Sequence, residues 1–435
     1  MEIVMPRARR LGSVIAVLVL GLSGCGGSSN DAASAAPGAP GVTREPCPQA
    51  IDKEKGCIYL GIISDLTQGP FHEQGVPITR AQQAFWRRVN QQGGVGGYEV
   101  DVTRYVADSK YDPDEHQRLY RGMRSRVLAL AQTLGSPTTA RILPELRAAK
   151  VVATPASWIS AWEFEDVMLE SGANYCFESM NAVDHAVSAW RSESVVAVHY
   201  DSDYGADSTA GARIAAYRND MTFKTVKTTP GADRQAAAVA AIVAAKPDLV
   251  LLSVGPADLG AIVAQATRAG YRGRFIGNAP TWIKSLLEIR DTATVAALKE
   301  RYVQAAPWKP FASDSPGHTA MRKALGPVEP NDNYTYGWVW SYPLKAVLQR
   351  AAANGELTRA GMLKAVRQVA RIDYEGMLPA EAGDFSGDPD SAAFRGTVFG
   401  MPDTGELTGV RVVKDFYTGP TAERHRLDRP CAGGS

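Results

Sequence analysis

The chain has 435 residues, of which 45% are hydrophobic, with 47 lysines and arginines against 46 aspartates and glutamates. This length is enough for two or three domains of ordinary size. The balanced charge excludes the basic surface that nucleic-acid-binding domains carry, so we expect no nucleic-acid partner.

The first 24 residues have the pattern of an export signal. Three arginines among the first ten residues precede a short apolar run at 11–22, and small residues then lead to Cys25. The run is shorter than the roughly 20 residues that span a bilayer. This pattern resembles the lipobox of bacterial lipoproteins, which implies cleavage before Cys25 and a lipid on its sulfur. The alternatives are an ordinary secretory signal and a transmembrane helix.

Residues 25–56 are expected to form a flexible tether, because the segment begins with glycine, serine, alanine and proline and has little to bury. Four further cysteines, Cys47, Cys57, Cys176 and Cys431, are an even number in an oxidising compartment. Three pairings are possible. One of them closes a short loop between Cys47 and Cys57 and leaves Cys176 to hold the C-terminal tail through Cys431. None of the cysteines has CxxC spacing, so we expect no zinc site.

The segment that follows the tether has the pattern of a βαβ unit. An apolar run at 58–63, rich in β-branched residues, leads into a loop of turn formers at 64–75. Apolar residues at steps of three and four predict a helix at 76–90, and an alternating strand follows at 98–105. In such units the loop after the first strand is where ligands bind.

The alternation of strands and helices continues in two series. The remaining strands are expected at 127–131, 151–153, 194–200, 222–228, 249–253 and 275–276. Two series of this kind predict an α/β protein with two parallel-sheet lobes. The chain has no GxGxxG, P-loop lysine, HExxH or GxSxG motif, so we expect no cofactor and no metal.

Two polar turns follow successive strands of the first series. The turn at 135–139 and the turn at 154–158 place hydroxyls and free backbone amides at helix starts, where the helix dipole favours an anion. A carboxylate is the obvious candidate. In the alternative interpretation Thr138 and Ser157 only cap helices.

The order of these segments resembles a known family. The chain reads IISDLTQGPFHEQG, NQQGGVGGYEVDV, LGSPTTA, VVATPAS, VHYDSDYGADSTAG, PDLVLLSVGPADL and FIGNAP in sequence. This is similar to the branched-chain amino acid binding proteins that feed ABC importers and have the type I periplasmic binding fold. The resemblance covers about 58 to at least 347 and implies two Rossmann-like lobes joined by a three-crossing hinge. The first lobe is then 57–180 with 306–370, and the second is 181–305 with 371–435.

The resemblance also implies a solute site between the lobes. In the family the loop matching LGSPTT supplies a hydroxyl, here Ser136 or Thr138, and the loop matching TPASW supplies a backbone carbonyl at Ala156. The expected ligand-binding residues are Phe71, Ser136, Thr138, Ala156, Ser157, Trp158, Tyr204 and Trp282. For each of these residues, packing or capping is the alternative role.

A departure from the family narrows the class of solute. Members that bind an α-amino acid meet its ammonium with an acidic residue, and that position falls on Asn278 or Ala279 here. A buried ammonium without a carboxylate is unfavourable by several kcal/mol. Trp158, Tyr204 and Trp282 instead suit a flat, aromatic or amphipathic molecule, and a carboxylate still fits the two polar turns.

The C-terminal part is expected to complete both lobes. Residues 333–353 read as a helix that returns to the first lobe, with Tyr334 and Tyr336 near the cleft, although two tyrosines at a helix start more often pack. Residues 385–415 read as a hairpin of the second lobe. The loop at 307–316 is either a crossing or an insertion.

The resemblance implies an extracytoplasmic binding protein that closes on a small-molecule solute and docks on ABC permease subunits, anchored to the bilayer through the acylated cysteine. A sensory subunit with the same fold is the first alternative. The second is a hydrolase, which needs a nucleophile beside a base. Only His72 lies in a predicted cleft loop, and no partner set is evident. We therefore expect that this protein is not an enzyme.

Overall fold

The computed structural model describes residues 39–433. The predicted signal peptide at 1–24 and the predicted lipidation site Cys25 lie outside the described residues. Within 39–433, no helix has the length and apolar character needed to cross a membrane.

The first sheet is built from the predicted βαβ unit. Its strands are β1 (Val42–Thr43), β2 (Gly56–Ser64), β3 (Tyr98–Asp108), β4 (Ala129–Leu134) and β5 (Ala153–Ala156). Strand β2 lies between β3 and β4, β5 is next to β4, and these four strands run parallel, whereas β1 pairs antiparallel with the start of β2. Because β2 is buried on both faces, its sequence is a continuous apolar run and not an alternating one.

The second sheet is larger. Its strands are β6 (Ser194–Tyr200), β7 (Thr222–Thr228), β8 (Leu249–Ser253), β9 (Arg274–Gly277), β10 (Tyr302–Ala306), β11 (Thr397–Pro402) and β12 (Val410–Tyr417). The order is β7-β6-β8-β9-β10-β11-β12, in which the first five strands are parallel and the last two are antiparallel. In both sheets the first strand of the series has neighbours on either side, which creates the crevice where open α/β sheets bind ligands.

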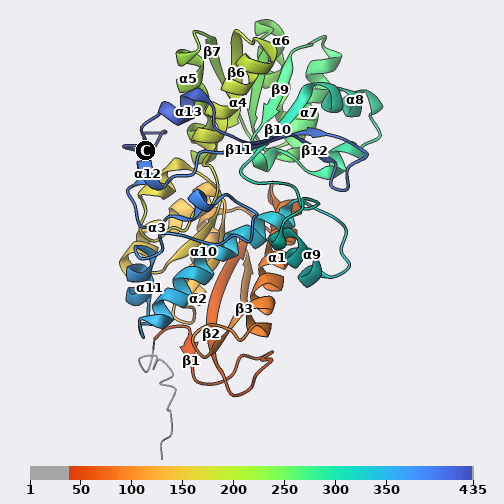
Figure 1. Cartoon of the computed structure of the whole chain (residues 1–435). Coiled ribbons are helices and arrows are strands. Elements are labelled where there is room, and N and C mark those ends of the chain that lie inside the picture. The colour runs from red at the N-terminus through yellow and green to blue at the C-terminus, as the bar shows by residue number, and fades with distance from the viewer. Residues whose placement is uncertain (1–38, 434–435) are drawn as a thin grey trace, which may run out of the picture. The chain divides into compact units, whose positions relative to one another are not determined.

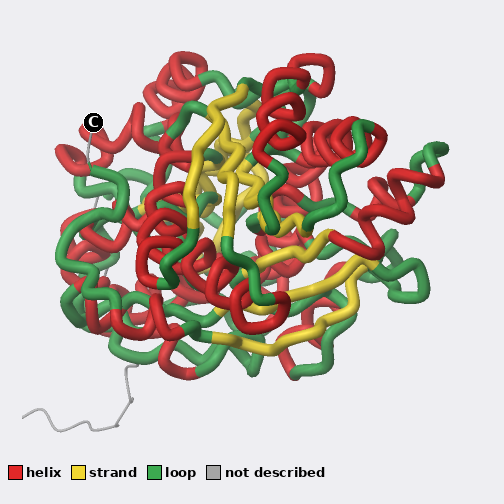
Figure 2. Tube along the Cα trace, turned by 90° about the horizontal axis from the view of Figure 1, so that it is seen from above, coloured by secondary structure: helices red, strands yellow, loops and turns green. Residues whose placement is uncertain are grey.

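Helices cover both sheets (Figure 2). The helices of the first lobe are α1 (His72–Gln91), α2 (Pro113–Met123), α3 (Ser136–Ala149), α9 (Pro316–Leu325), α10 (Asn333–Ala353) and α11 (Arg359–Val366). Those of the second lobe are α4 (Tyr175–Trp190), α5 (Asp203–Arg218), α6 (Ala236–Ala245), α7 (Pro256–Arg268), α8 (Thr292–Arg301) and α13 (Pro420–Arg424). Short helical turns lie at Ser160–Phe164, Ala232–Arg234, Ala279–Thr281, Lys284–Leu287, Ala380–Gly383 and Pro389–Ala392.

The chain passes between the two lobes three times. The crossings connect β5 to α4, β10 to α9, and α11 to β11. Helix α10 therefore packs against α1 and β5 of the first lobe although it comes late in the chain (Figure 1). The predicted α/β fold with two parallel-sheet lobes and a three-crossing hinge is confirmed.

The structure adjusts several predicted boundaries. Helix α1 begins at His72 and not at 76, because the Phe71 carbonyl already accepts the amides of Gln74 and Gly75. Strand β4 starts two residues after the predicted start. The loop at 307–316 belongs to the second crossing, and its Trp308 is buried. The lobe boundaries proposed from the resemblance stay a prediction.

Of the three possible cysteine pairings, the structure contains the one with Cys47–Cys57 and Cys176–Cys431. Cys57 lies in β2 and Cys176 in the first turn of α4. The first disulfide therefore fixes the approach to the first sheet, and the second fastens the C-terminal tail to the second lobe.

Candidate functional site

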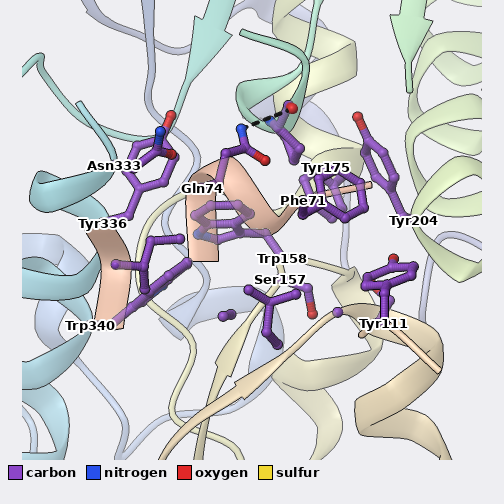
Figure 3. A pocket seen from close by; sticks show the side chains of 16 residues that line it. Phe71, Gln74, Tyr111, Ser157, Trp158, Tyr175, Tyr204, Asn333, Tyr336 and Trp340 are labelled. Atoms are coloured by element: carbon purple, nitrogen blue, oxygen red, sulfur yellow. Dashed lines mark hydrogen bonds between the residues drawn. The ribbon is translucent and has the colours of Figure 1, made fainter. Parts of the chain in front are cut away.

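A cavity lies where the carboxyl ends of strands from both sheets meet, and its empty space, including the part open to solvent, is about 430 Å³. It is lined by Phe71, Gln74, Ile78, Tyr111, Leu134, Gly135, Ser136, Ala156, Ser157, Trp158, Tyr175, Tyr204, Pro280, Asn333, Tyr336 and Trp340. These residues come from the loops after β2, β3, β4, β5 and β9 and from the starts of α1, α4, α5 and α10. Both lobes thus contribute to one enclosure, as Figure 3 shows.

Six of the eight residues predicted from the sequence line this cavity, namely Phe71, Ser136, Ala156, Ser157, Trp158 and Tyr204. Thr138 and Trp282 are not among the lining residues. The Thr138 hydroxyl donates back to the carbonyls of Leu134 and Gly135 in the preceding turn, so it neither lines the cavity nor caps the helix. The Trp282 ring stacks on Tyr302 at 5.4 Å, behind the site.

The middle of the cavity is an aromatic box around Trp158. The Trp158 ring lies 5.5 Å from Tyr175, 5.7 Å from Tyr336 and 4.9 Å from Trp340. Its indole Nε1 donates to the Ser171 carbonyl at 2.9 Å, which fixes the ring plane. Such a box offers a ligand apolar surface and stacking geometry on several sides.

Two further aromatic pairs complete the walls. Tyr204 of the second lobe lies 4.5 Å from Tyr175, and Phe71 lies 5.0 Å from Tyr111. Phe71 is held in place because its amide donates to the buried Asp65 carboxylate at 3.0 Å. The wall that contains Phe71 is therefore held in place by a hydrogen-bonded backbone.

One end of the cavity is suited to an anion. Helix α3 starts there at Ser136, and the Ser136 hydroxyl is 1% exposed with no hydrogen-bond partner among the described residues. Gly135 precedes it with φ of +97°, and a side chain at Gly135 would collide with the Tyr111 ring. The backbone thus comes close to the cavity, so that the Ser136 hydroxyl and the amides of Ser136 and Thr138 can bind a carboxylate together, whereas Pro137 has no amide hydrogen.

Hydrogen bonding elsewhere in the cavity is sparse. The Gln74 amide donates across the lobes to the Pro280 carbonyl at 3.0 Å (Figure 3). The Tyr204 hydroxyl and the Trp340 indole nitrogen are buried and have no partner within the described part of the chain. None of the sixteen lining residues carries a charged or titratable acid, lysine, arginine or histidine side chain. The cavity is therefore apolar, with a few neutral donors.

The position expected to meet an ammonium group holds a neutral network instead. Asn278 is fully buried outside the cavity lining, and its Oδ1 accepts from the hydroxyls of Ser208 and Ser253. Its Nδ2 donates to Glu178 at 3.2 Å. Burial raises the pKa of Glu178 to about 8, so this carboxyl group is mostly uncharged at neutral pH.

Replacing Glu178 by glutamine is expected to flatten the pH dependence of stability. A glutamate ionises near pH 4.5 when unfolded, whereas Glu178 has a folded pKa of about 8. Between these values the unfolded state releases a proton that the folded state keeps, so stability falls as pH rises. Glutamine does not titrate, and its carbonyl still accepts the Ala279 amide. Urea unfolding at about pH 5, 6.5 and 8 measures the free energy of unfolding at each pH. If that free energy changes with pH equally in wild type and Glu178→Gln, the prediction is wrong.

The sequence patterns did not place several lining residues in the site. Gln74 falls in the predicted loop at 64–75 but was not singled out there, and Tyr175 is the first residue of α4, a helix that the sequence pattern did not predict. Trp340 lies inside α10, where a helical pattern predicts packing. Tyr336 was expected near the cleft without a binding role. Tyr111 has φ of +62°, a conformation that is uncommon for a tyrosine and often marks a functional position, but it leaves no trace in the sequence.

Comparisons with known proteins agree with this fold. A family model described as periplasmic binding protein matches residues 58–400. Among curated proteins, no sequence matches the chain. A solved structure of a fatty acid ABC transporter substrate-binding protein from Thermomonospora curvata is similar, with 25% identity, a TM-score of 0.81, and coverage of 91% of this chain and 98% of that chain.

Two further solved structures show the same fold at lower identity. A branched-chain amino acid ABC transporter protein from Thermus thermophilus with bound valine has 16% identity and a TM-score of 0.72, over 85% of this chain and 98% of that one. A leucine-binding protein from Thermotoga maritima has 16% identity and a TM-score of 0.69, over 83% and 99%.

Proposed function

The chain belongs to the periplasmic binding protein family, as its sequence predicts, and from this premise we propose that it captures a small carboxylic acid for an ABC importer. The acid has an apolar or aromatic body and no second charge. Its body lies in the aromatic box and its carboxylate at the start of α3. The similarity to a fatty acid transporter component at 25% identity supports the same class of solute.

One observation carries this proposal: the lining has no charged side chain, while the buried Ser136 hydroxyl has no hydrogen-bond partner among the described residues. An α-amino acid would bring an ammonium group into the cavity with no carboxylate to meet it, which is unfavourable by several kcal/mol. A carboxylate at the α3 start has the helix dipole, backbone amides and a hydroxyl. The site therefore favours an acid over its amino acid analogue.

We place the protein outside the cytoplasm, attached to the membrane through acylated Cys25, with ABC permease subunits as partners. Opening and closing follow from the three crossings, because a solute that touches both lobes favours the closed state by its extra affinity for that state. The bond from Gln74 to Pro280 joins the lobes beside the cavity.

A matched ligand series tests the solute class. We expect 3-phenylpropionate and octanoate to raise the melting temperature of the purified protein. L-Phenylalanine, which adds an ammonium group to 3-phenylpropionate, and 3-phenylpropanamide, which removes its charge, are expected to have little effect. A ligand at 100 times its dissociation constant stabilises by about 2.7 kcal/mol, which thermal unfolding resolves. Tighter binding of phenylalanine than of 3-phenylpropionate would refute the proposal.

Replacing Ser136 by alanine is expected to weaken binding of the acid by about 10- to 150-fold, because a hydrogen bond to a charged group contributes about 1.5–3 kcal/mol. Unfolding without ligand should hardly change, since the hydroxyl has no hydrogen-bond partner within residues 39–433. Ser157→Ala is the matched control: Ser157 also lines the cavity, but its hydroxyl accepts from the Trp162 indole at 3.1 Å. Calorimetric titration of both variants measures the difference. Equal affinity of wild type and Ser136→Ala for the acid would show that Ser136 does not bind the solute.

A further inference from the structure

A second cavity lies beside the hinge, and its empty space, including the part open to solvent, is about 580 Å³. Its walls come from the first crossing, at 162–172, and from the third crossing together with the end of α11, at 366–394. Both segments carry the chain between the lobes, and no residue of the proposed solute site lines this cavity.

The cavity is lined by five acidic side chains and one arginine. Three of the acids have partners. Glu165 pairs with Arg147, and Asp166 pairs with Arg367. Asp384 accepts the amide and the hydroxyl of a serine two residues later, at 2.8 and 2.7 Å. The remaining two acids, Glu163 and Glu170, have no ion-pair partner among the described residues.

Glu170 is the most unusual of these acids. It is 7% exposed, and neither of its carboxyl oxygens has a hydrogen-bond partner in the part of the chain that the structure describes. Burial and the neighbouring acids Glu163 and Asp207 raise its pKa well above the ordinary value. Burial also raises the pKa of Glu163 to about 7. A buried carboxyl group without any partner is rare in folded proteins and calls for a positive ligand.

Aromatic side chains share the cavity with these acids. Trp162, Phe385 and Phe394 belong to its lining. Aromatic faces beside a carboxylate are the surroundings that organic ammonium ions favour, through cation–π attraction. Within 39–433, no three acidic, histidine or cysteine side chains are arranged to hold a metal ion. These observations favour an amine over a metal.

We propose that the hinge cavity binds a small organic ammonium ion, with the Glu170 carboxylate as its counter-ion and the aromatic side chains as its walls. This site is separate from the proposed solute site and does not depend on the identity of that solute. An ion bound here contacts two of the three crossings.

The proposal fixes the direction of the pH dependence. An alkylammonium keeps its charge below about pH 10, whereas Glu170 must lose its proton to bind it. Affinity is therefore expected to rise between pH 6 and 8 in wild-type protein. The charged neighbours of Glu170 are Glu163 and Asp207, and Arg395 faces Glu163; burial raises the pKa of Asp207 to about 6. Ionisation of Glu163 and Asp207 adds negative charge near the ammonium ion as pH rises, which acts in the same direction.

The test is calorimetric titration of the full chain with n-butylammonium chloride, and in parallel with choline chloride and calcium chloride. We expect n-butylammonium to bind the wild type and Glu170→Gln to weaken it about tenfold or more, as for loss of a charge-assisted bond. Glu165→Gln is the matched control, because it makes the same change in the same cavity at an acid that already has Arg147. Its affinity for n-butylammonium should stay within about threefold of wild type.

Three outcomes would overturn the site. They are no binding of either ammonium ion, binding of calcium alone, and equal affinity of wild type and Glu170→Gln. If Glu170→Gln does not fold, the wild-type titrations at pH 6 and 8 decide, since affinity that is flat or falls with pH contradicts a Glu170 counter-ion. Binding of 3-phenylpropionate should persist in the presence of n-butylammonium, so failure here leaves the proposed function untouched.

Discussion

Replacing Cys176 and Cys431 together by serine is expected to lower the free energy of unfolding by about 5 kcal/mol. These cysteines are 255 residues apart in the chain, so their bond removes much of the conformational freedom of the unfolded state. The bond also joins the first turn of α4 to the C-terminal tail. There the Cys431 amide donates to the Ser160 hydroxyl at 2.8 Å, and Asp207 binds both Ser160 and the Cys176 amide. Chemical denaturation under non-reducing conditions measures the loss.

The other disulfide is the control for this prediction. Cys47 and Cys57 are 10 residues apart, so replacing both by serine is expected to lower stability by only about 2.5–3 kcal/mol. The difference between the two double variants isolates the effect of loop length, because both changes are chemically identical. Equal losses would contradict the loop-length argument. A larger loss for the short loop would show that strand β2, which contains Cys57, depends on its anchored start.

The fold could be predicted from the sequence because its signals are local. A buried parallel strand is a short apolar run, and the residues after it must turn, so strands and loops alternate visibly along the chain. Once the order of strands is known, the rule that ligands bind at the carboxyl ends places the loops after β2, β4, β5 and β6 near one another. The individual residues in these loops, Phe71, Ser136, Trp158 and Tyr204, were predicted from the family resemblance, and all four line the cavity.

The rest of the candidate site depends on contacts that no local pattern records. Tyr175 and Trp340 reach the cavity from helices that follow the first and second crossings, and their place depends on how those crossings bend. Trp282 is an aromatic residue of the kind expected in the site, but a turn at 279–281 directs its ring onto Tyr302. Thr138 has the right hydroxyl, but that hydroxyl donates to the backbone carbonyls of Leu134 and Gly135.

Buried acids are the hardest residues to interpret from sequence. Glu170 and Glu178 look like ordinary polar positions, and only the packed structure shows that both are removed from water. Their raised pKa values have burial as the first cause. Glu178 belongs to the network that replaces the expected ammonium partner, whereas Glu170 lines the hinge cavity.

Replacing Trp158 by alanine is expected to lower the free energy of unfolding by about 3–5 kcal/mol, as for other large buried aromatics. The side chain is 2% exposed and its ring packs against Tyr175, Tyr336 and Trp340. Truncation also leaves the Ser171 carbonyl without its donor. The same change opens the centre of the proposed solute site, so we expect affinity for 3-phenylpropionate to fall by at least about tenfold, since burying an aromatic side chain contributes about 1.5–3 kcal/mol.

Trp282→Ala separates the two effects of Trp158→Ala. Trp282 is 3% exposed and stacks on Tyr302, so its loss should lower stability by a similar 3–5 kcal/mol or so. It does not line the cavity, and affinity for 3-phenylpropionate, measured by calorimetry well below the unfolding transition, should stay close to wild type. If Trp158→Ala loses stability but keeps its affinity, Trp158 is a packing residue and the solute lies elsewhere in the cavity. If Trp282→Ala weakens binding as much as Trp158→Ala does, the solute site extends behind the wall formed by Pro280, as the sequence prediction for Trp282 requires.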